Sequence, residues 1–128
     1  MGGLFIGYET ARALGVRSLF LERVNGVFEL RRGFEIKPGE KVLIVEDVLT
    51  TGKSTLEVKE FVDKYGKGTV TGVGCITERV KPERKDSLLD ELGVPLVSLL
   101  EVSAEARDPS DCPGCKDGKP LIKPGSRA

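Results

Sequence analysis

Residues 42–54 read VLIVEDVLTTGKS, and the order of residue types in this segment indicates the fold class. Its first four residues are continuously apolar, which is typical of a strand covered on both faces in a parallel sheet. The carboxylates of Glu46 and Asp47 follow at once, and a loop of hydroxyls and a glycine comes next. Because open α/β sheets bind ligands at the carboxyl ends of their strands, we expect a central parallel strand over residues 41–47 that leads into a ligand site.

Hydrophobic periodicity and turn residues on either side of this stretch predict alternating helices and strands. The expected elements are a helix over 4–14, hairpin strands over 18–22 and 27–30 around Asn25-Gly26, the central strand, a helix over 54–65, a strand over 70–77, a short helix over 86–92, a strand over 95–102 and a Pro/Gly-rich tail from Asp108. This order predicts one α/β domain over residues 1–128, with an open, mainly parallel sheet flanked by helices. The hairpin arm would cover about 18–34 and the tail about 108–128.

Composition excludes several classes of function. The chain has 128 residues, 20 basic and 20 acidic side chains, three cysteines and no histidine. The balanced charge gives no reason to expect a nucleic-acid or membrane partner. Neither a membrane span nor a signal peptide is visible in the sequence, which predicts a cytoplasmic protein. Without histidine, the Ser-His-Asp and Cys-His arrangements of nucleophilic catalysis are excluded.

The end of the opening stretch is similar to a nucleotide-binding P-loop, but it departs from one in an important way. The P-loop pattern G-x-x-x-x-G-K-[ST] requires a glycine five residues before Gly52, and Asp47 stands there. Two adjacent carboxylates at this point would repel a polyphosphate. A P-loop interpretation is therefore poor.

The residues of the loop suit a single phosphate better. Thr50 to Thr55 offer hydroxyls, a flexible glycine, backbone N–H groups and the start of a helix. The acidic pair before the loop is suited to binding sugar hydroxyls, directly or through Mg²⁺. Together these features predict a ribose 5-phosphate site. The alternative is that Glu46 and Asp47 only solvate a strand end and that the loop is an ordinary helix cap.

The segment VLIVEDVLTTGKS resembles the phosphoribosyl-diphosphate-binding signature of the type I phosphoribosyltransferases. With residues 7–52 and the segments GVGCITER, GVPLVSLL and DPSDCPGCKDGKPLIKPGSR, the chain is similar to orotate phosphoribosyltransferase over nearly its whole length. The resemblance implies a glycosyltransferase (pentosyltransferase) of pyrimidine and UMP biosynthesis. Its substrates would be orotate and 5-phosphoribosyl 1-diphosphate, its cofactor Mg²⁺ and its assembly a homodimer.

The resemblance also assigns roles to residues. Glu46 and Asp47 match the acidic pair that holds the ribose hydroxyls, and Asp47 is the candidate for contact with ligand-bound Mg²⁺. Thr50 matches a threonine that contacts orotate. The positions implied in binding 5-phosphoribosyl 1-diphosphate are Glu46, Asp47, Val48, Leu49, Thr50, Thr51, Gly52, Lys53 and Ser54.

Four arginines complete the implied site. Arg79 matches the arginine that binds the orotate carboxylate, a role for which a planar guanidinium is well suited; the alternative is a solvated arginine at a strand end. Arg23, Arg31 and Arg32 lie on the hairpin that matches the family's catalytic arm, which brings positive charge to the diphosphate leaving group. The alternative for the arm is a solvated hairpin face.

Two departures from the family pattern matter. Gly2-Gly3 match the end of the family's diphosphate loop, so we expect an N-terminally shortened relative that lacks the hood and the first core strand and is a poor catalyst by itself. Lys53 stands where relatives more often have a small or acidic residue. Two other functions therefore stay open: a phosphoribosyltransferase-fold regulator or binding module without catalysis, and a phosphoribosyltransferase for another nucleobase.

Cys112 and Cys115 form a Cys-Pro-Gly-Cys motif. A zinc site needs four ligands, and the only other cysteine is Cys75. A redox motif is expected at the start of a helix that follows a strand, whereas this one lies in a Pro/Gly-rich tail. We therefore interpret the motif as part of the family's tail.

Overall fold

A computed structural model describes residues 2–80, 90–104, 107–120 and 122. Its elements, in chain order, are α1 (Gly3–Leu14), β1 (Leu21–Val24), β2 (Val27–Leu30), β3 (Lys41–Leu49), α2 (Lys53–Phe61), the π-helical turn η1 (Val62–Gly66), β4 (Thr69–Val80), the 3-10 turn η2 (Asp90–Leu92), β5 (Leu96–Ser103) and α3 (Pro113–Lys116). The predicted alternation of helices and parallel strands is confirmed. None of the described helices is long and apolar enough to cross a membrane.

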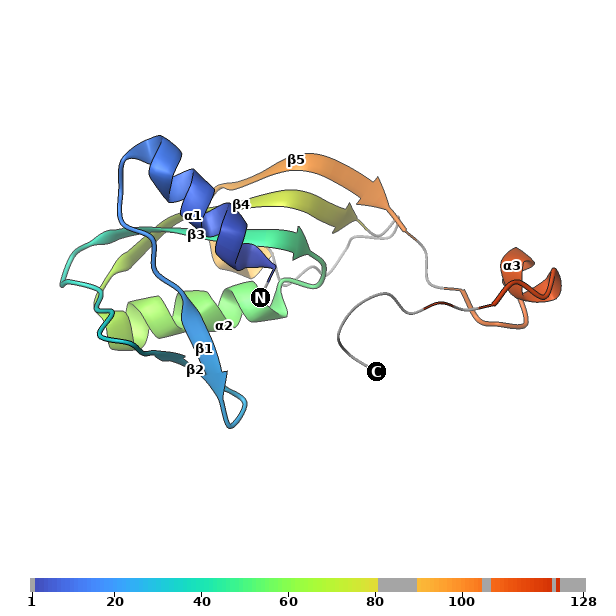
Figure 1. Ribbon diagram of the computed structural model, residues 1–128, viewed down its shortest axis with the longest axis horizontal. Helices are drawn as coiled ribbons and strands as arrows, with labels where there is room; N and C mark the ends of the chain where they lie inside the picture. The colour runs from blue at the N-terminus through green and yellow to red at the C-terminus, as the bar shows by residue number, and fades with distance from the viewer. Residues whose placement is uncertain (1, 81–89, 105–106, 121, 123–128) are drawn as a thin grey trace.

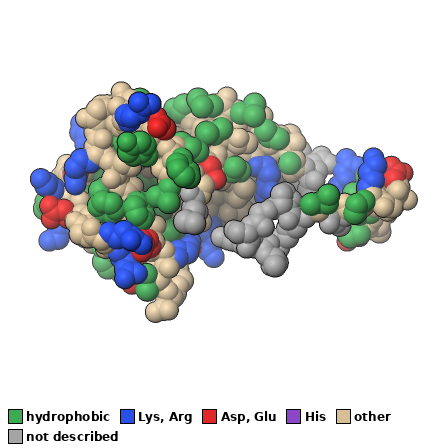
Figure 2. Space-filling view, viewed as in Figure 1, with side chains coloured by type: hydrophobic (Ala, Val, Ile, Leu, Met, Phe, Trp, Pro, Cys, Tyr) green, Lys and Arg blue, Asp and Glu red, His purple; other side chains and the backbone are tan. Residues whose placement is uncertain are grey.

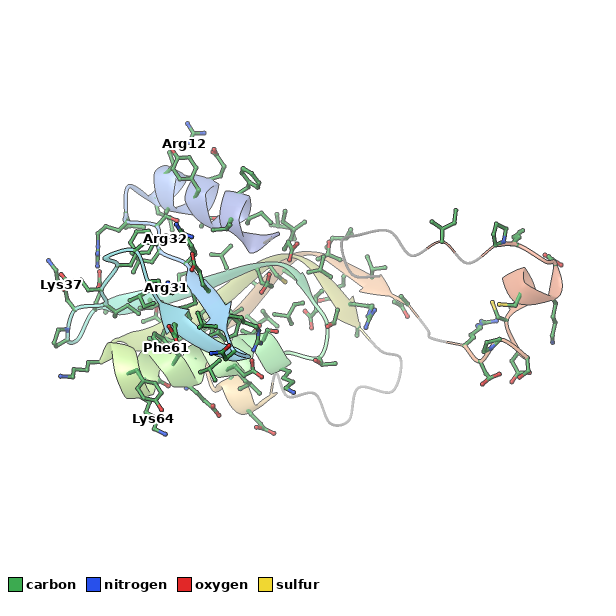
Figure 3. All side chains as sticks on the ribbon, turned by 60° about the horizontal axis from the view of Figure 1, so that its bottom comes forward. Arg12, Arg31, Arg32, Lys37, Phe61 and Lys64 are labelled. Atoms are coloured by element: carbon green, nitrogen blue, oxygen red, sulfur yellow. The ribbon has the colours of Figure 1, made fainter. Side chains whose placement is uncertain are left out.

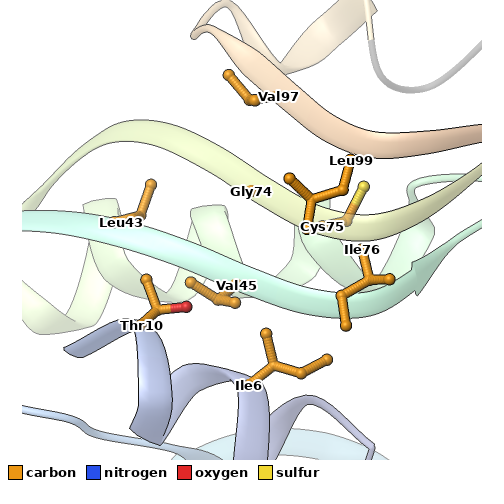
Figure 4. A pocket seen from close by; sticks show the side chains of 9 residues that line it. All are labelled: Ile6, Thr10, Leu43, Val45, Gly74, Cys75, Ile76, Val97 and Leu99. Carbon is orange, nitrogen blue, oxygen red and sulfur yellow. The ribbon is translucent and has the colours of Figure 1, made fainter. Parts of the chain in front are cut away.

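The described sheet has three parallel strands in the order β3-β4-β5 (Figure 1). The prediction that residues 41–47 form the central strand is wrong in this respect, because β4 is central and β3 lies at an edge of the sheet. The apolar run has another cause. In Figure 4, α1 and α2 lie on opposite faces of the sheet, so β3 needs apolar side chains on both faces wherever it lies in the strand order.

The core lies mainly between the sheet and the α2 side of the molecule. Its buried members are Ile44, Leu49, Val62, Val70, Val73, Cys75 and Leu92. The other face of the sheet is covered less completely. Figure 2 shows hydrophobic side chains at the surface over α1 and β5, where Phe5 is 82% and Leu99 is 80% exposed.

The hairpin formed by β1 and β2 is antiparallel and pairs Val24 with Val27. Asn25 and Gly26 both have positive φ, 51° and 85°, as the two-residue turn predicted from their dipeptide requires. Its first strand was predicted over 18–22 but begins at Leu21. Residues before Leu21 would need partners beyond Leu30, where Arg32 takes a left-handed φ of 59° and ends the pairing.

The helix boundaries mostly follow the predicted signals. Gly15 takes a left-handed conformation, φ 66°, and its N–H donates to the Arg12 carbonyl at the end of α1. The helix predicted over 54–65 is confirmed as α2 continued by η1. Most of the short helix predicted over 86–92 falls outside the described residues, and its last three residues form η2. The tail contains α3, a helical turn that was not predicted.

Candidate functional site at the carboxyl end of β3

Glu46 and Asp47 lie near the carboxyl end of β3, where both side chains are half-buried. The backbone N–H of Asp47 lies 3.2 Å from Glu46 Oε1, and the N–H of Val48 donates to Asp47 Oδ1 at 2.8 Å. The strand continues two residues beyond the predicted end, to Leu49. The backbone of the strand thus fixes the position of both carboxyl groups.

The two carboxyl groups differ in proton affinity. Burial raises the pKa of Glu46, and its hydrogen bond with Asp47 raises it further. The same hydrogen bond, with Glu46 as its partner, holds the pKa of Asp47 below the ordinary value. The pair therefore retains one proton, on Glu46, more readily than two isolated carboxyl groups would. This reduces the repulsion that the pair would exert on an approaching phosphate.

The first turn of α1 lies against the acidic pair. A Cβ atom placed on Gly2 would be 1.5 Å from Asp47 Oδ2, and one on Gly3 would be 3.2 Å from Glu46 Oε1. Only a residue without a side chain fits at Gly2 while Asp47 keeps this position. The first N–H groups of a helix have no partner within it, so this arrangement brings hydrogen-bond donors close to the carboxylates.

The loop after β3 leads directly into α2. Gly52, the residue before α2, is buried and has a left-handed φ of 79°, and no side chain caps the helix. The N–H of Lys53 lies 3.4 Å from Thr51 Oγ1, and the side chains of Thr50, Thr51, Lys53 and Ser54 are exposed. The loop thus brings hydroxyls, an ammonium group and the N–H groups at the start of a helix together, and such groups can hold an anion.

Arg79 reaches the same end of the sheet from β4. Leu49 and Glu78 are the last residues that β3 and β4 pair. Thr50 and Arg79 each follow one of them, so they lie at the same height along the sheet. The side chain of Arg79 is exposed. The two residues that the resemblance assigns to orotate therefore lie at the same end of the sheet, Thr50 directly after β3 and Arg79 on the adjacent strand β4.

The three hairpin arginines have partners elsewhere. Arg23 pairs with Glu57 of α2, donates to the Gly26 carbonyl at 2.8 Å and lies 4.0 Å from the centre of the Phe28 ring. These contacts hold the hairpin against α2. The structure therefore does not bring Arg23 to the acidic pair.

Arg31 and Arg32 follow β2 at the end of the hairpin opposite its turn, as Figure 3 shows. Both pair with Glu22, at 3.5 Å and 2.5 Å respectively. Both side chains are exposed. The solvated-face interpretation and the catalytic-arm interpretation of these arginines both stay open on this geometry.

One buried carboxylate on β4 could not be recognised from the sequence. Glu78 of β4 is only 4% exposed. It pairs with Leu49 of β3 on one side and with Glu101 of β5 on the other. Burial raises the pKa of Cys75, and the charges of Glu78 and then Glu46 raise it further. In the sequence, a glutamate followed by an arginine near the end of a strand is expected in solvent. Only the tertiary packing reveals that Glu78 is buried.

A separate pocket lies between α1 and the sheet (Figure 4). Ile6 and Thr10 of α1, Val45 of β3, Ile76 of β4, and Val97 and Leu99 of β5 are among its lining residues. The lining is mainly apolar, and it provides none of the charged groups that a sugar phosphate requires. Within the described residues there is also no group of three or more His, Cys, Asp or Glu side chains placed to hold a metal ion.

The sequence was compared with protein-family models and with curated proteins. No family model matches the sequence. Orotate phosphoribosyltransferase of Pelotomaculum thermopropionicum is 54% identical over 127 residues, which cover 99% of this chain and 63% of that protein. The Thermotoga maritima protein of the same name is 51% identical over 127 residues, covering 99% and 64%.

Solved structures support the fold. The orotate phosphoribosyltransferase from Aeropyrum pernix matches with a TM-score of 0.62 at 28% identity, over 80% of this chain and 56% of that one. An adenine phosphoribosyltransferase from Saccharomyces cerevisiae matches with a TM-score of 0.62 over 78% of this chain and 62% of that one, and its 22% identity supports the fold alone. The fold is thus that of the type I phosphoribosyltransferases.

The chain spans 63–64% of the length of these curated relatives. The matched region contains the acidic pair, the hydroxyl loop, the hairpin and Arg79. On this identity along 99% of its length, the chain belongs to the orotate phosphoribosyltransferase family.

Proposed function

We propose that this chain forms the ribose-phosphate-binding core of an orotate phosphoribosyltransferase. The enzyme would transfer the 5-phosphoribosyl group from 5-phosphoribosyl 1-diphosphate to orotate, giving orotidine 5'-monophosphate and diphosphate in pyrimidine biosynthesis. One observation carries the proposal: in a chain 54% identical to a curated enzyme of that name, the acidic pair and the Thr50–Ser54 loop adjoin the first turns of two helices.

The acidic pair binds the ribose hydroxyls, and the loop binds the 5'-phosphate. Asp47, whose lowered pKa keeps it ionised, accepts hydrogen bonds from a ribose hydroxyl, and Glu46 lies beside it for the second hydroxyl. The 5'-phosphate lies at the loop, where the exposed hydroxyls and the first N–H groups of α2 donate to its oxygens. This orientation holds ribose C1 in a fixed position for attack by orotate.

The residues present fit Mg²⁺ held mainly by the substrate. Mg²⁺ is usually bound through one or two carboxylates together with substrate phosphates, and Asp47 provides an ionised carboxylate at the site. When bound, the ion supplies positive charge that stabilises the diphosphate as it leaves.

Arg79 recognises orotate through its carboxylate. A guanidinium forms two parallel hydrogen bonds to a carboxylate, and the exposed position of Arg79 at the level of Thr50 leaves it open to the base. A purine has no carboxylate at all. The preference for orotate over other bases therefore depends on this residue.

The hairpin arginines provide positive charge for the leaving group when the arm moves. Arg31 and Arg32 are exposed and share the carboxylate of Glu22. Exposed ion pairs of this kind contribute only about 0–1 kcal/mol, so exchanging Glu22 for a diphosphate costs little.

The proposed assembly is a homodimer, and the proposed location is the cytoplasm. The exposed apolar side chains over α1 and β5 support association, because large exposed apolar patches usually mark contact surfaces. Orotate and 5-phosphoribosyl 1-diphosphate are small polar metabolites, and their use in nucleotide synthesis fits a cytoplasmic location.

Calorimetric titration with 5-phosphoribosyl 1-diphosphate and Mg²⁺ tests the site. Replacing Asp47 by Asn should weaken binding by about 1.5–3 kcal/mol, because a hydrogen bond to a charged acceptor is lost. Glu60→Gln, an exposed change on α2, is the matched control and should have no effect. A crystal soaked with orotidine monophosphate should show the ribose phosphate at Thr50–Ser54. Ordered ligand bound only elsewhere would contradict the assignment.

Nucleobase choice separates the proposal from its alternatives. With 5-phosphoribosyl 1-diphosphate and Mg²⁺ supplied, nucleotide formation should be observed with orotate and not with adenine. Formation with adenine would indicate a phosphoribosyltransferase for another base. Tight binding of 5-phosphoribosyl 1-diphosphate without nucleotide formation from any base would indicate a binding module.

A further inference from the structure

Cys112 directly precedes the helical turn α3 and Cys115 lies within it, apart from the proposed substrate site. Cys112 precedes the helix with an extended backbone (φ −80°, ψ 119°), and Pro113 occupies the first turn. The N–H of Lys116 donates to the Cys112 carbonyl at 3.1 Å, and the N–H of Asp117 donates to that of Pro113 at 2.9 Å. The hydrogen bond from Lys116 to Cys112 closes the first turn of the helix, so the backbone holds both cysteines in this one turn.

The two sulfur atoms have different surroundings. The Cys115 N–H, the Cys115 thiol and the Gly114 N–H all hydrogen-bond to the Cys112 sulfur, and together with the charge of Arg107 they lower the pKa of Cys112. A Cβ atom on Gly114 would lie 3.8 Å from that sulfur, an ordinary van der Waals contact, so the sulfur lies beside the backbone of the turn. The hydrogen bond to Cys112 raises the pKa of Cys115. One thiol is thus the better nucleophile, and the other keeps its proton.

The surroundings do not complete a metal site. No group of three or more potential ligands occurs within the part of the chain that the structure describes. Cys75, the third cysteine, is buried in β4. A tetrahedral thiolate site would therefore need both cysteines of a second chain.

We infer that Cys112 and Cys115 form a reversible dithiol–disulfide pair that exchanges with a low-molecular-weight disulfide. The Cys112 thiolate attacks one sulfur of the small disulfide, forms a mixed disulfide and releases one thiolate, which takes up a proton. Cys115 then loses its proton and attacks the Cys112 sulfur, which releases the second small thiol. Two electrons and two protons pass from the protein to the small disulfide, which becomes two thiols.

The position of the motif permits this reaction without unfolding. Neither cysteine of the pair is buried, and Figure 1 shows α3 apart from the sheet. Cys75 differs because it is buried, and its burial raises its pKa. The chain therefore contains an internal reference thiol that should not react while the protein is folded.

The test uses the full chain equilibrated in mixtures of reduced and oxidised glutathione. Samples are quenched with acid, treated with an alkylating reagent, digested and analysed by mass spectrometry. The expected product is a peptide in which Cys112 and Cys115 are joined, two hydrogens lighter than the reduced form and restored by dithiothreitol. Its fraction should rise with the proportion of oxidised glutathione, while Cys75 stays reduced.

Two single variants test the assigned order of attack. Cys112→Ser and Cys115→Ser should both lose the internal disulfide and accumulate a glutathione adduct instead. The Cys115→Ser protein, which keeps Cys112, should react faster at neutral pH than the Cys112→Ser protein. Equal rates would overturn the assignment of Cys112 as the nucleophile.

Three results would overturn the inference as a whole. The first is glutathione adducts on the wild-type chain without an internal disulfide. The second is disulfides that join only different chains. The third is tight binding of one zinc ion per two chains that protects both cysteines from alkylation until a chelator is added, which would show a shared metal site.

Discussion

Replacing Gly2 by Ala should destabilise the protein by disturbing Asp47. The new Cβ would lie 1.5 Å from Asp47 Oδ2 and 2.4 Å from its Cγ, so the whole carboxyl group must move. Forcing a side chain away from its rotamer costs about 0.5–1.5 kcal/mol, and losing its hydrogen bond from the Val48 N–H costs about 1 kcal/mol more. Alanine also lowers the conformational entropy of the unfolded chain, which stabilises the folded protein by about 0.4–1 kcal/mol. The net loss is about 1 kcal/mol.

Gly7 provides the matched control on the same helix. A Cβ atom there meets nothing within 4 Å, so Gly7→Ala should stabilise the protein by about 0.5–1 kcal/mol through helix propensity. The two variants should thus differ by roughly 2 kcal/mol in free energy of unfolding, measured by urea titration with circular dichroism.

A double-mutant cycle gives the decisive result. In an Asp47→Ala background the obstructing carboxylate is absent, so Gly2→Ala should change from destabilising to neutral or stabilising. If the cost of Gly2→Ala persists in that background, the close approach of α1 to Asp47 is not its cause, and the described geometry of the site is wrong.

Three further changes are expected to have distinct effects. Leu49→Ala should lower the free energy of unfolding by about 2–5 kcal/mol in urea titrations, because Leu49 is 1% exposed in the core, whereas Leu99→Ala at 80% exposure should change it little. Burial raises the pKa of Glu46 above its ordinary 4.5, so the folded protein binds the Glu46 proton more tightly than the unfolded chain does. The contribution of this proton to stability is therefore fully present below pH 4.5 and is lost as the pH rises through the folded-state pKa. Glu46→Gln should therefore stabilise the protein at pH 7 relative to wild type, and this advantage should shrink towards pH 4 in thermal melts. Arg79→Ala should weaken orotate binding by about 1.5–3 kcal/mol in calorimetry while leaving 5-phosphoribosyl 1-diphosphate nearly unaffected, and equal weakening of both would make Arg79 structural.

Much of the fold was predictable because local signals agree with the tertiary structure. Gly15 ends α1, Asn25-Gly26 forms the hairpin turn, and the apolar run of β3 becomes a parallel strand. The position of β3 at the sheet edge was not predictable, since side-chain pattern reports which faces are covered and not which strands lie alongside. The start of β1 was missed for a similar reason, because only the partner strand limits its length.

The site was predictable where its residues are contiguous in sequence. Glu46, Asp47 and the loop to Ser54 lie together because they follow one another along one strand-to-helix connection. The hairpin arginines show the limit of that reasoning. Their charge was visible in the sequence, but their partners were not: Arg23 pairs with Glu57 because the hairpin packs on α2, and Arg31 and Arg32 pair with Glu22 within the hairpin. The burial of Glu78 is likewise a tertiary effect.

The loop from Thr50 to Ser54 is anchored by a buried residue at each end. Leu49 before it is 1% exposed and Thr55 after it is 3% exposed. The five residues between them, four exposed residues and Gly52, are therefore held at both ends by the core. The N–H of Leu56, in the first turn of α2, also donates to the Gly52 carbonyl at 2.9 Å and ties the loop to the helix. A short chain fixed at both ends has little conformational entropy left to lose when an anion binds. For the phosphate that we propose to bind here, the loop would therefore be preorganised, and most of the interaction energy would remain available as affinity.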